Sequence, residues 1–215
     1  MSFILINYAD GQIHLRNRNI QVDSAESRCN FDRIIQYDRS ILRDTFLSLH
    51  KELLDYKHGA GLWLWKPYIL LHTLHYEAEK GDIVFYCDSD WAFLKNPDHF
   101  KKRAEEVDIL LFHENGDKAE SWTAPNTFNN MNACSTEYKQ TTMLLAGYNL
   151  WKCCEKSIDF LKKWIQLCCR PEVIVPINNY KGGHCYEQSI LTLLAKQEGI
   201  VAEPSPKIDW TICQL

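Results

Sequence analysis

Two aspartates follow a strongly hydrophobic segment in the stretch GDIVFYCDSDWAFL, which covers residues 81–94. Asp88 and Asp90 are separated by one serine, so their carboxylates can converge on one hard cation, and Mg²⁺ or Mn²⁺ prefers such oxygen ligands. Unpaired carboxylates beside a core are costly, and a bound cation would remove that cost. In the alternative interpretation one aspartate caps a turn and the other is solvated, because roughly one Asp-x-Asp is expected by chance in a chain of this length.

The position of the two aspartates favours the metal interpretation. The β-branched and aromatic residues 83–86 are typical of a strand that is buried on both faces. Open α/β sheets bind their ligands at the carboxyl ends of such strands. Phosphatases that form an aspartyl-phosphate also carry aspartates after a strand. In their motif a small residue and then threonine or valine normally follow, whereas Trp91, Ala92 and Phe93 follow here.

The elements that must position these residues alternate along the chain. Apolar runs predict strands over residues 3–9, 31–38, 83–87, 107–112 and 141–151, with a last strand and tail over 200–215. Helical spacing, caps and Pro67 predict helices over residues 40–56, 65–80, 96–106, 155–170 and 186–196. The polar residues 113–135 show no periodicity and predict a long loop. This order favours one α/β domain whose central sheet is mixed, mostly parallel and flanked by helices.

Composition limits the classes of function. The chain has 215 residues and a formal net charge of −4, which fits one globular domain and argues against a nucleic-acid binder with a basic face. No apolar stretch reaches the roughly eighteen residues that a membrane helix needs, and the first residues do not have the pattern of a signal peptide. We therefore expect no membrane span and a cytoplasmic location.

Four stretches resemble a known family when they are taken in order. They are GLWLWKPYILLHTL at 61–74, GDIVFYCDSD at 81–90, MLLAGYNLW at 143–151 and HCYEQSILTLLAK at 184–196. Together they resemble nucleotide-sugar glycosyltransferases of the GT-A fold, of the small DxD-containing kind found in microbes and large DNA viruses. The likeness runs from the first strand to Gly199.

The resemblance implies a Rossmann-like GT-A domain, with a nucleotide-binding part at about 1–112 and an acceptor and sugar part at about 113–215. It implies a hexosyltransferase that uses Mn²⁺ or Mg²⁺ and moves glucose or rhamnose from a UDP-sugar to a glycan or glycoprotein acceptor. The chain also looks like the amino-terminal glycosyltransferase domain of a chlorovirus protein that helps to build the capsid glycan. That likeness implies a role in the host cytoplasm and further domains in a longer polypeptide.

Carried over by position, the resemblance assigns roles to individual residues. It gives the metal-bridged diphosphate to Asp88, Ser89 and Asp90, with Asp90 as the more direct ligand. It places Asn7, Tyr8 and Ala9 beside the nucleotide base, Trp65 and Lys66 facing the donor, and Ala146 and Gly147 along the sugar. Glu187 and Gln188 stand where the family often has Asp-Gln near the transferred sugar. Glu187 differs from the aspartate of that pattern by one additional methylene group.

Other residues are candidates for supporting chemistry. Lys66, Arg39 or Arg43 could bind the phosphates, although isolated basic residues are usually solvated. His184 follows two glycines that allow close approach to a ligand, and Asp209 is a candidate third metal ligand. Trp122 stands in a polar segment with no periodic reason to be buried, which makes it the candidate for stacking on an acceptor sugar.

The stereochemistry of transfer stays open at this point. Inversion needs a carboxylate base near the acceptor hydroxyl, for which Glu187, Asp209, Glu114 and Glu120 are the candidates. Retention needs no dedicated base, and the family resemblance favours it slightly. The alternative function is a carbohydrate-binding or interaction module that has the fold without turnover.

Overall fold

The computed structural model describes residues 1–177 and 180–205. Its centre is a five-stranded sheet with the strand order β2-β1-β3-β7-β4. The bounds are β1 Phe3–Tyr8, β2 Arg33–Tyr37, β3 Ile83–Cys87, β4 Ile109–Leu110 and β7 Tyr148–Lys152. β1 pairs in parallel with β2 and β3, while β7 is antiparallel to both β3 and β4. Four of the five strands therefore run in one direction, which confirms the mixed, mostly parallel sheet.

Side chains of β1 and β3 alternate between two buried faces of this sheet. Phe3 and Leu5 belong to one hydrophobic cluster, and Ile4 and Ile6 belong to the other. The side chains of β3 also alternate between these two clusters, and all five of its residues are fully buried. A central strand covered on both faces has this uninterrupted apolar sequence.

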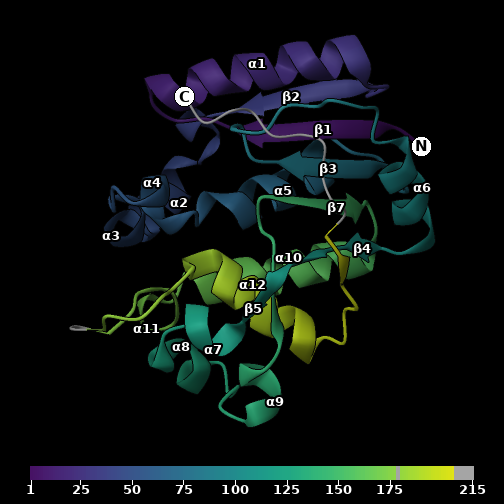
Figure 1. Ribbon diagram of the computed structural model, residues 1–215. Helices are drawn as coiled ribbons and strands as arrows, with labels where there is room; N and C mark the ends of the chain where they lie inside the picture. Colours follow the sequence, from purple (N-terminus) through teal and green to yellow (C-terminus); the bar gives the residue numbers. More distant parts are fainter. Residues whose placement is uncertain (178–179, 206–215) are drawn as a thin grey trace.

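Helices cover both faces of the sheet (Figure 1). Residues of α1 Gln12–Arg28 and α6 Asp98–Glu106 pack on one face. Residues of α5 Trp65–Tyr76, α10 Glu155–Cys168 and α12 Tyr186–Gln197 pack on the other. The predicted helices over 96–106, 155–170 and 186–196 are confirmed, and so is the position of Pro67 in a first turn.

The helix α1 was missed in the sequence because it has no apolar stripe. Its buried residues are Asn17, Gln21, Val22, Ser24 and Ala25, most of which are polar or small. Two parallel neighbouring strands need a crossover connection, usually a helix. That rule, applied to the strands over 3–9 and 31–38, was the available signal for α1.

The single helix predicted over 40–56 is wrong, because the segment is divided into short pieces. They are the 3-10 helix η1 Arg39–Ile41, α2 Asp44–Leu49 and α3 Lys51–Leu54. The backbone is extended at Leu42 and Arg43, and the Arg43 N–H donates to the Tyr68 hydroxyl at 3.2 Å. A hydrogen bond to another helix thus replaces one that a continuous helix would make.

Two predicted strands divide because the chain changes sheets within them. A second sheet has the order β6-β5-β8, with β5 Phe112–Lys118, β6 Thr142–Leu144 and β8 Glu203–Pro204. The segment 107–112 therefore leaves the central sheet after β4 and enters β5. The segment 141–151 changes from β6 to β7 through residues 145–147, which brings Ala146 and Gly147 to the end of β3.

The long loop predicted over 113–135 is also wrong. The segment contains most of β5, then α7 Ala119–Trp122 and α8 Pro125–Asn130, and α9 Thr136–Lys139 follows it. Its polar side chains are used inside the protein, since Asn126 and Thr127 bond backbone carbonyls around α11 Pro171–Ile174. Because buried positions of α8 are occupied by polar residues, the segment shows no apolar helical period.

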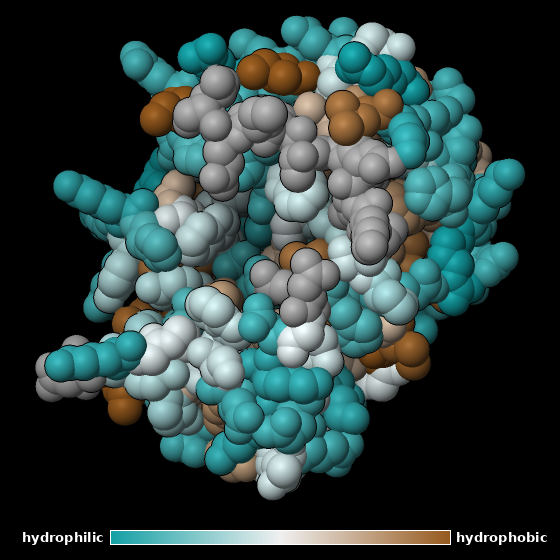
Figure 2. All heavy atoms as spheres, viewed as in Figure 1, coloured by the Kyte–Doolittle hydropathy of each residue, from teal (hydrophilic) through white to brown (hydrophobic). Residues whose placement is uncertain are grey.

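No helix in the described part of the chain combines the length and the apolar character needed to cross a bilayer. The face drawn in Figure 2 is mainly hydrophilic, with separate hydrophobic residues among the polar ones.

Candidate active site

The strand β3 delivers Asp88, Ser89 and Asp90 to the carboxyl end of the central sheet. Asp88 is held by its backbone as well as its side chain. Its N–H donates to the Gly147 carbonyl at 2.7 Å, and its carbonyl accepts from the Gln21 side chain at 2.7 Å. The Tyr86 hydroxyl donates to Asp88 Oδ1. The carboxylate therefore has a fixed position on a rigid strand end.

Lys66 lies in the interior and joins this aspartate to α12. Only 2% of its side chain is exposed, and its Nζ lies 3.3 Å from Asp88 Oδ1 and 3.1 Å from Glu187 Oε1. The same Nζ donates to the Ala146 carbonyl at 3.2 Å. Burial alone would lower the pKa of Lys66, but the charges of Asp88 and Glu187 outweigh it and raise the pKa. Lys66 is thus a permanent, buried cation between Asp88, which lines the cleft, and Glu187.

Glu187 is the second carboxylate bound by Lys66. Burial, and to a smaller extent the charge of Asp88, raise its pKa to about 7 against the attraction of Lys66. A carboxyl group with this pKa has both protonation states available near neutral pH, which is the condition for general acid–base catalysis. We call Lys66, Asp88 and Glu187 the lysine–carboxylate cluster.

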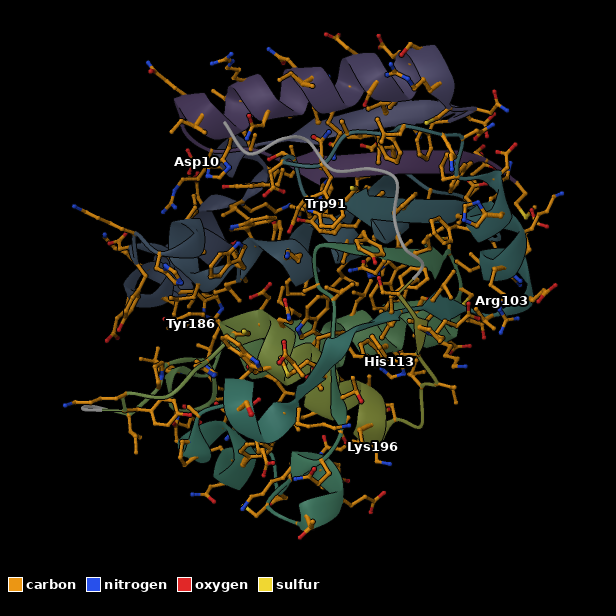
Figure 3. The ribbon with its side chains drawn as sticks, viewed as in Figure 1. Asp10, Trp91, Arg103, His113, Tyr186 and Lys196 are labelled. Carbon is orange, nitrogen blue, oxygen red and sulfur yellow. The ribbon has the colours of Figure 1, made fainter. Side chains whose placement is uncertain are left out.

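A cleft of about 670 Å³ opens beside the lysine–carboxylate cluster. Its walls come from the ends of β1 and β3, the start of α1 and the segment 54–65. The lining residues that carry polar or aromatic groups include Tyr8, Asp10, His14, Arg39, Asp55, Tyr56, Lys57, Trp63, Trp65, Asp88, Ser89 and Asp90. Figure 3 shows Asp10 at the start of α1, on the side of the molecule where α2, α3 and α4 Gly59–Leu62 also lie.

Aromatic and polar groups at the end of β1 form one end of the cleft. The rings of Tyr8 and Trp65 are stacked, with their centroids 3.8 Å apart and an interplanar angle of 14°. The Tyr8 hydroxyl and Asn7 Oδ1 are buried and have no hydrogen-bond partner among residues 1–177 and 180–205. Buried polar atoms are usually satisfied, so unsatisfied ones beside a cleft are a signal of a functional site. Burial, followed by the charge of Asp10, raises the pKa of Tyr8 and keeps its hydroxyl protonated.

The two carboxylates of the DSD sequence fit a divalent cation by their chemistry. Burial raises the pKa of Asp90, and the nearby charge of Asp88 raises it further, so the two carboxylates repel each other even though Lys66 contacts Asp88. In the described residues no three His, Cys, Asp or Glu side chains converge as a complete metal site. A Mg²⁺ or Mn²⁺ that is held by one or two carboxylates and takes its other ligands from phosphate and water needs no such third residue.

The other predicted residues lie in several places. Arg39 and Ser89 line the cleft, and Gly147 is so close to Asp88 that a Cβ on it would lie 3.1 Å from Oδ2. Ala9 is buried and donates its N–H to the Tyr37 carbonyl at 3.1 Å. Gln188 follows Glu187 on α12 and is half-buried.

Two of the predicted residues, His184 and Arg43, do not line the cleft and contact other groups. His184 accepts from the Ala124 N–H at Nδ1, 3.2 Å away, and its Nε2 lies 2.9 Å from the Ile174 carbonyl. Arg43 lies over the ring of Tyr76, with 5.1 Å between its guanidinium carbon and the ring centroid, and is not part of the cleft lining.

The weaker candidates lie in the second part of the chain. Trp122 is 40% exposed at the end of α7, and Glu120 bonds the Gln140 side chain at 2.7 Å. Glu114 lies in β5. Asp209 lies outside the described residues.

Sequence reasoning missed two kinds of feature. The first is the pair Gln21 and Tyr86, which hold Asp88 in position; Gln21 also accepts from the Asn7 side chain at 2.9 Å. A glutamine in a helix and a tyrosine in a strand are ordinary residues, so the sequence did not mark either of them as functional. The second feature is a left-handed turn over residues 59–63, in which φ is positive at every residue. Left-handed backbone costs about 1–2 kcal/mol per non-glycine residue, and only the two glycines of HGAG hint at it.

The chain is an α/β domain with a fold of the GT-A type, as a comparison with solved structures shows. Among solved structures, the apo form of mouse xyloside xylosyltransferase 1 is similar, with a TM-score of 0.56. The match covers 94% of this chain and 84% of that chain, at 10% sequence identity, so the likeness concerns the fold alone. It confirms the predicted GT-A fold. No family model and no curated protein matches the sequence.

Proposed function

We propose that this chain is a glycosyltransferase that moves a sugar from a nucleoside diphosphate to a glycan acceptor. The observation that carries the proposal is the lysine–carboxylate cluster. It places Lys66, Asp88 and Glu187 in contact at the carboxyl end of β3, beside a cleft large enough for a ligand. The similarity in fold to a xylosyltransferase supports the same class of reaction.

The donor in this proposal is a UDP-sugar. Its base lies at the end of β1, where the stacked Tyr8 and Trp65 supply aromatic surface and the Tyr8 hydroxyl has no partner in the described part of the chain. Its diphosphate lies at Asp88 and Asp90, with Arg39 available for charge-assisted hydrogen bonds. Asp88 and Asp90 hold Mn²⁺ or Mg²⁺, which supplies positive charge to the departing diphosphate.

The residues of the chain have separate roles in transfer. Lys66 fixes the orientation of both carboxylates and adds positive charge beneath the leaving group. Burial raises the pKa of Glu187 to about 7, and this carboxyl group, which contacts Lys66, is the candidate to accept or hold the proton of the acceptor hydroxyl. Gly147 keeps space free beside Asp88 Oδ2 for the donor. Both retention and inversion are compatible with these roles.

The finer parts of the proposal rest on the sequence resemblance alone. They are glucose or rhamnose as the transferred sugar and a viral capsid glycan as the acceptor.

The test is donor binding followed by donor hydrolysis. Mn²⁺ and UDP-glucose together, at about 100 times their dissociation constants, should raise the melting temperature by about 5–10 °C. Asp90→Asn should abolish both this shift and the Mn²⁺-dependent release of UDP, while Asp159→Asn, which removes a surface carboxylate of α10, should keep both.

Three outcomes contradict the proposal. An unchanged melting temperature with every UDP-sugar tested would show that a UDP-sugar is not the donor. UDP release that survives Asp90→Asn would show that Asp90 does not act through a metal. Binding of a UDP-sugar without any release of UDP, with or without glycans, would identify a carbohydrate-binding module instead.

A further inference from the structure

Three aromatic residues form a cluster between the two parts of the chain. The ring centroids of His58 and Trp63 are 4.8 Å apart, those of His58 and Tyr186 5.1 Å, and those of Trp63 and Tyr186 5.9 Å. His58 and Trp63 belong to the segment around α4, whereas Tyr186 is the first residue of α12. Figure 3 shows Tyr186 at this end of α12, facing the side on which α3 and α4 lie. We call these three residues the aromatic platform.

Unfavourable backbone conformations hold the aromatic platform in place. Trp63 ends the left-handed turn with φ 56°, and Tyr186 has φ 45°. Positive φ at a bulky residue is an outlier, and such strain is concentrated at active sites and ligand clamps. The Trp63 ring also lies directly over Gly59, because a Cβ on Gly59 would be only 2.3 Å from it. The fold therefore bears a cost at two separate positions to bring these two rings together.

Each ring of the platform also carries a polar atom that is not used. Within the described part of the chain, no hydrogen bond is made by the Tyr186 hydroxyl, the His58 ring nitrogens or the Trp63 Nε1. His58 is exposed, and Trp63 and Tyr186 are half-buried. Here the rings combine an apolar face with free donors and acceptors at the surface.

The aromatic platform is continuous with the proposed active site. Trp63 lines the same cleft as Asp88 and Asp90. Tyr186 directly precedes Glu187, the carboxyl group that contacts Lys66. The platform therefore adjoins the cleft through Trp63 and the lysine–carboxylate cluster through the Tyr186–Glu187 link, and Trp65 donates its Nε1–H to Gly59 next to the Trp63 ring.

We propose that His58, Trp63 and Tyr186 bind a pyranose ring of the acceptor glycan. This inference rests on the proposed function, and it names the residues that hold the second substrate. A pyranose has an apolar face of C–H groups, which suits an aromatic ring, and a rim of hydroxyls, which suits the unused polar atoms. Bound there, the acceptor sugar lies next to the cleft that Trp63 lines together with Asp88 and Asp90.

The test uses methyl α- and β-glycosides of glucose, galactose, xylose and rhamnose as probes, with the donor absent. Binding is measured by saturation-transfer NMR on the whole chain. Tyr186→Asn removes the ring without adding strain, because asparagine tolerates the left-handed conformation. It should weaken binding of the preferred glycoside about fivefold or more, whereas Tyr186→Phe, which keeps the ring, should weaken it less. His58→Ala, at an exposed side chain, should weaken it without affecting folding.

The control is Tyr76→Asn, the same substitution at an exposed tyrosine of α5, which should leave glycoside binding unchanged. Thermal unfolding of each variant verifies that it is folded. The proposal is overturned if no glycoside gives a signal with the wild-type chain. It is also overturned if both Tyr186→Asn and His58→Ala bind as the wild type does.

The failure of this proposal can be distinguished from failure of the proposed function. If the chain binds UDP-sugars with Mn²⁺ but gives no glycoside signal, only the role of the aromatic platform is refuted. If the chain binds no UDP-sugar, the glycosyltransferase proposal is refuted, whether or not glycosides bind. With donor present, the ratio of sugar transfer to donor hydrolysis should fall in Tyr186→Asn and remain unchanged in Tyr76→Asn.

Discussion

Glu187→Gln should change how the stability of the protein depends on pH. The Glu187 side chain is 4% exposed, and burial raises its pKa from 4.5 to about 7 despite the attraction of Lys66. The folded protein therefore binds this proton more tightly than the unfolded chain does. This group favours folding fully below pH 4.5, and the contribution is lost as the pH rises through about 7.

The size of the effect follows from the two pKa values. Between pH 5 and pH 8, a carboxyl group with a pKa of 4.5 unfolded and about 7 folded reduces the free energy of unfolding by about 2.5 kcal/mol. Glutamine has nearly the same shape and can still accept a hydrogen bond from Lys66, but it does not titrate. The variant should lack this part of the pH dependence.

Urea unfolding at pH 5 and pH 8 measures the difference. Other titrating groups contribute almost equally to both proteins and cancel when the two pH dependences are subtracted. The wild type should lose about 2.5 kcal/mol more than Glu187→Gln between these pH values. Glu26→Gln, at an exposed glutamate of α1, should behave like the wild type. Equal pH dependence in the wild type and Glu187→Gln would refute the raised pKa and the catalytic role derived from it.

Three further substitutions test the packing around the cleft. Lys66→Met leaves two carboxylates without their cation and should reduce the free energy of urea unfolding by about 3–5 kcal/mol at pH 8; a loss below about 1 kcal/mol would contradict the buried contacts. Gly147→Ala puts a Cβ 3.1 Å from Asp88 Oδ2 and should slow UDP release at least about tenfold with almost no change in melting temperature. An unchanged rate would mean that Asp88 can move aside. Ala60→Gly removes one left-handed alanine, with φ 49°, and should raise the free energy of unfolding by about 0.5–1 kcal/mol, whereas destabilisation would show that Ala60 is not strained.

The central part of the fold could be predicted from local pattern. β1, β3 and α10 show the strand or helix period of a buried element, and Asp88 and Asp90 stand where β3 ends. Two of the failures, the helix α1 and the segment 113–135, share a cause: polar side chains occupy buried positions of their helices. α1 buries Asn17 and Gln21, and α8 buries Asn126 and Thr127. A pattern based on apolar periodicity cannot recognise such elements.

The site was predictable as a set of residues but not as an arrangement. Family resemblance singled out Lys66, Asp88 and Glu187, while nothing in their spacing indicates that one ammonium group lies between the two carboxylates. Their contact depends on how α5, β3 and α12 pack. The left-handed conformation of Trp63 and Tyr186 is still less visible, because neither residue type favours it.

The lysine–carboxylate cluster is better explained by function than by stability. Removing ionic groups from water is expensive, and a buried ion pair replaced by apolar residues of similar size often leaves stability unchanged or higher. The double variant Lys66→Met with Glu187→Leu should therefore recover most of the stability that Lys66→Met alone loses. In that variant the remaining carboxylate, Asp88, still accepts a hydrogen bond from the Tyr86 hydroxyl, and its side chain is 30% exposed to water. The double variant should nevertheless release no UDP from the donor, since it lacks both the fixed cation and the titrating carboxyl group. Urea unfolding and donor hydrolysis on the same three proteins separate the two explanations. If the double variant is less stable than Lys66→Met, the cluster serves to hold α5, β3 and α12 together, and the argument that it is kept for catalysis fails.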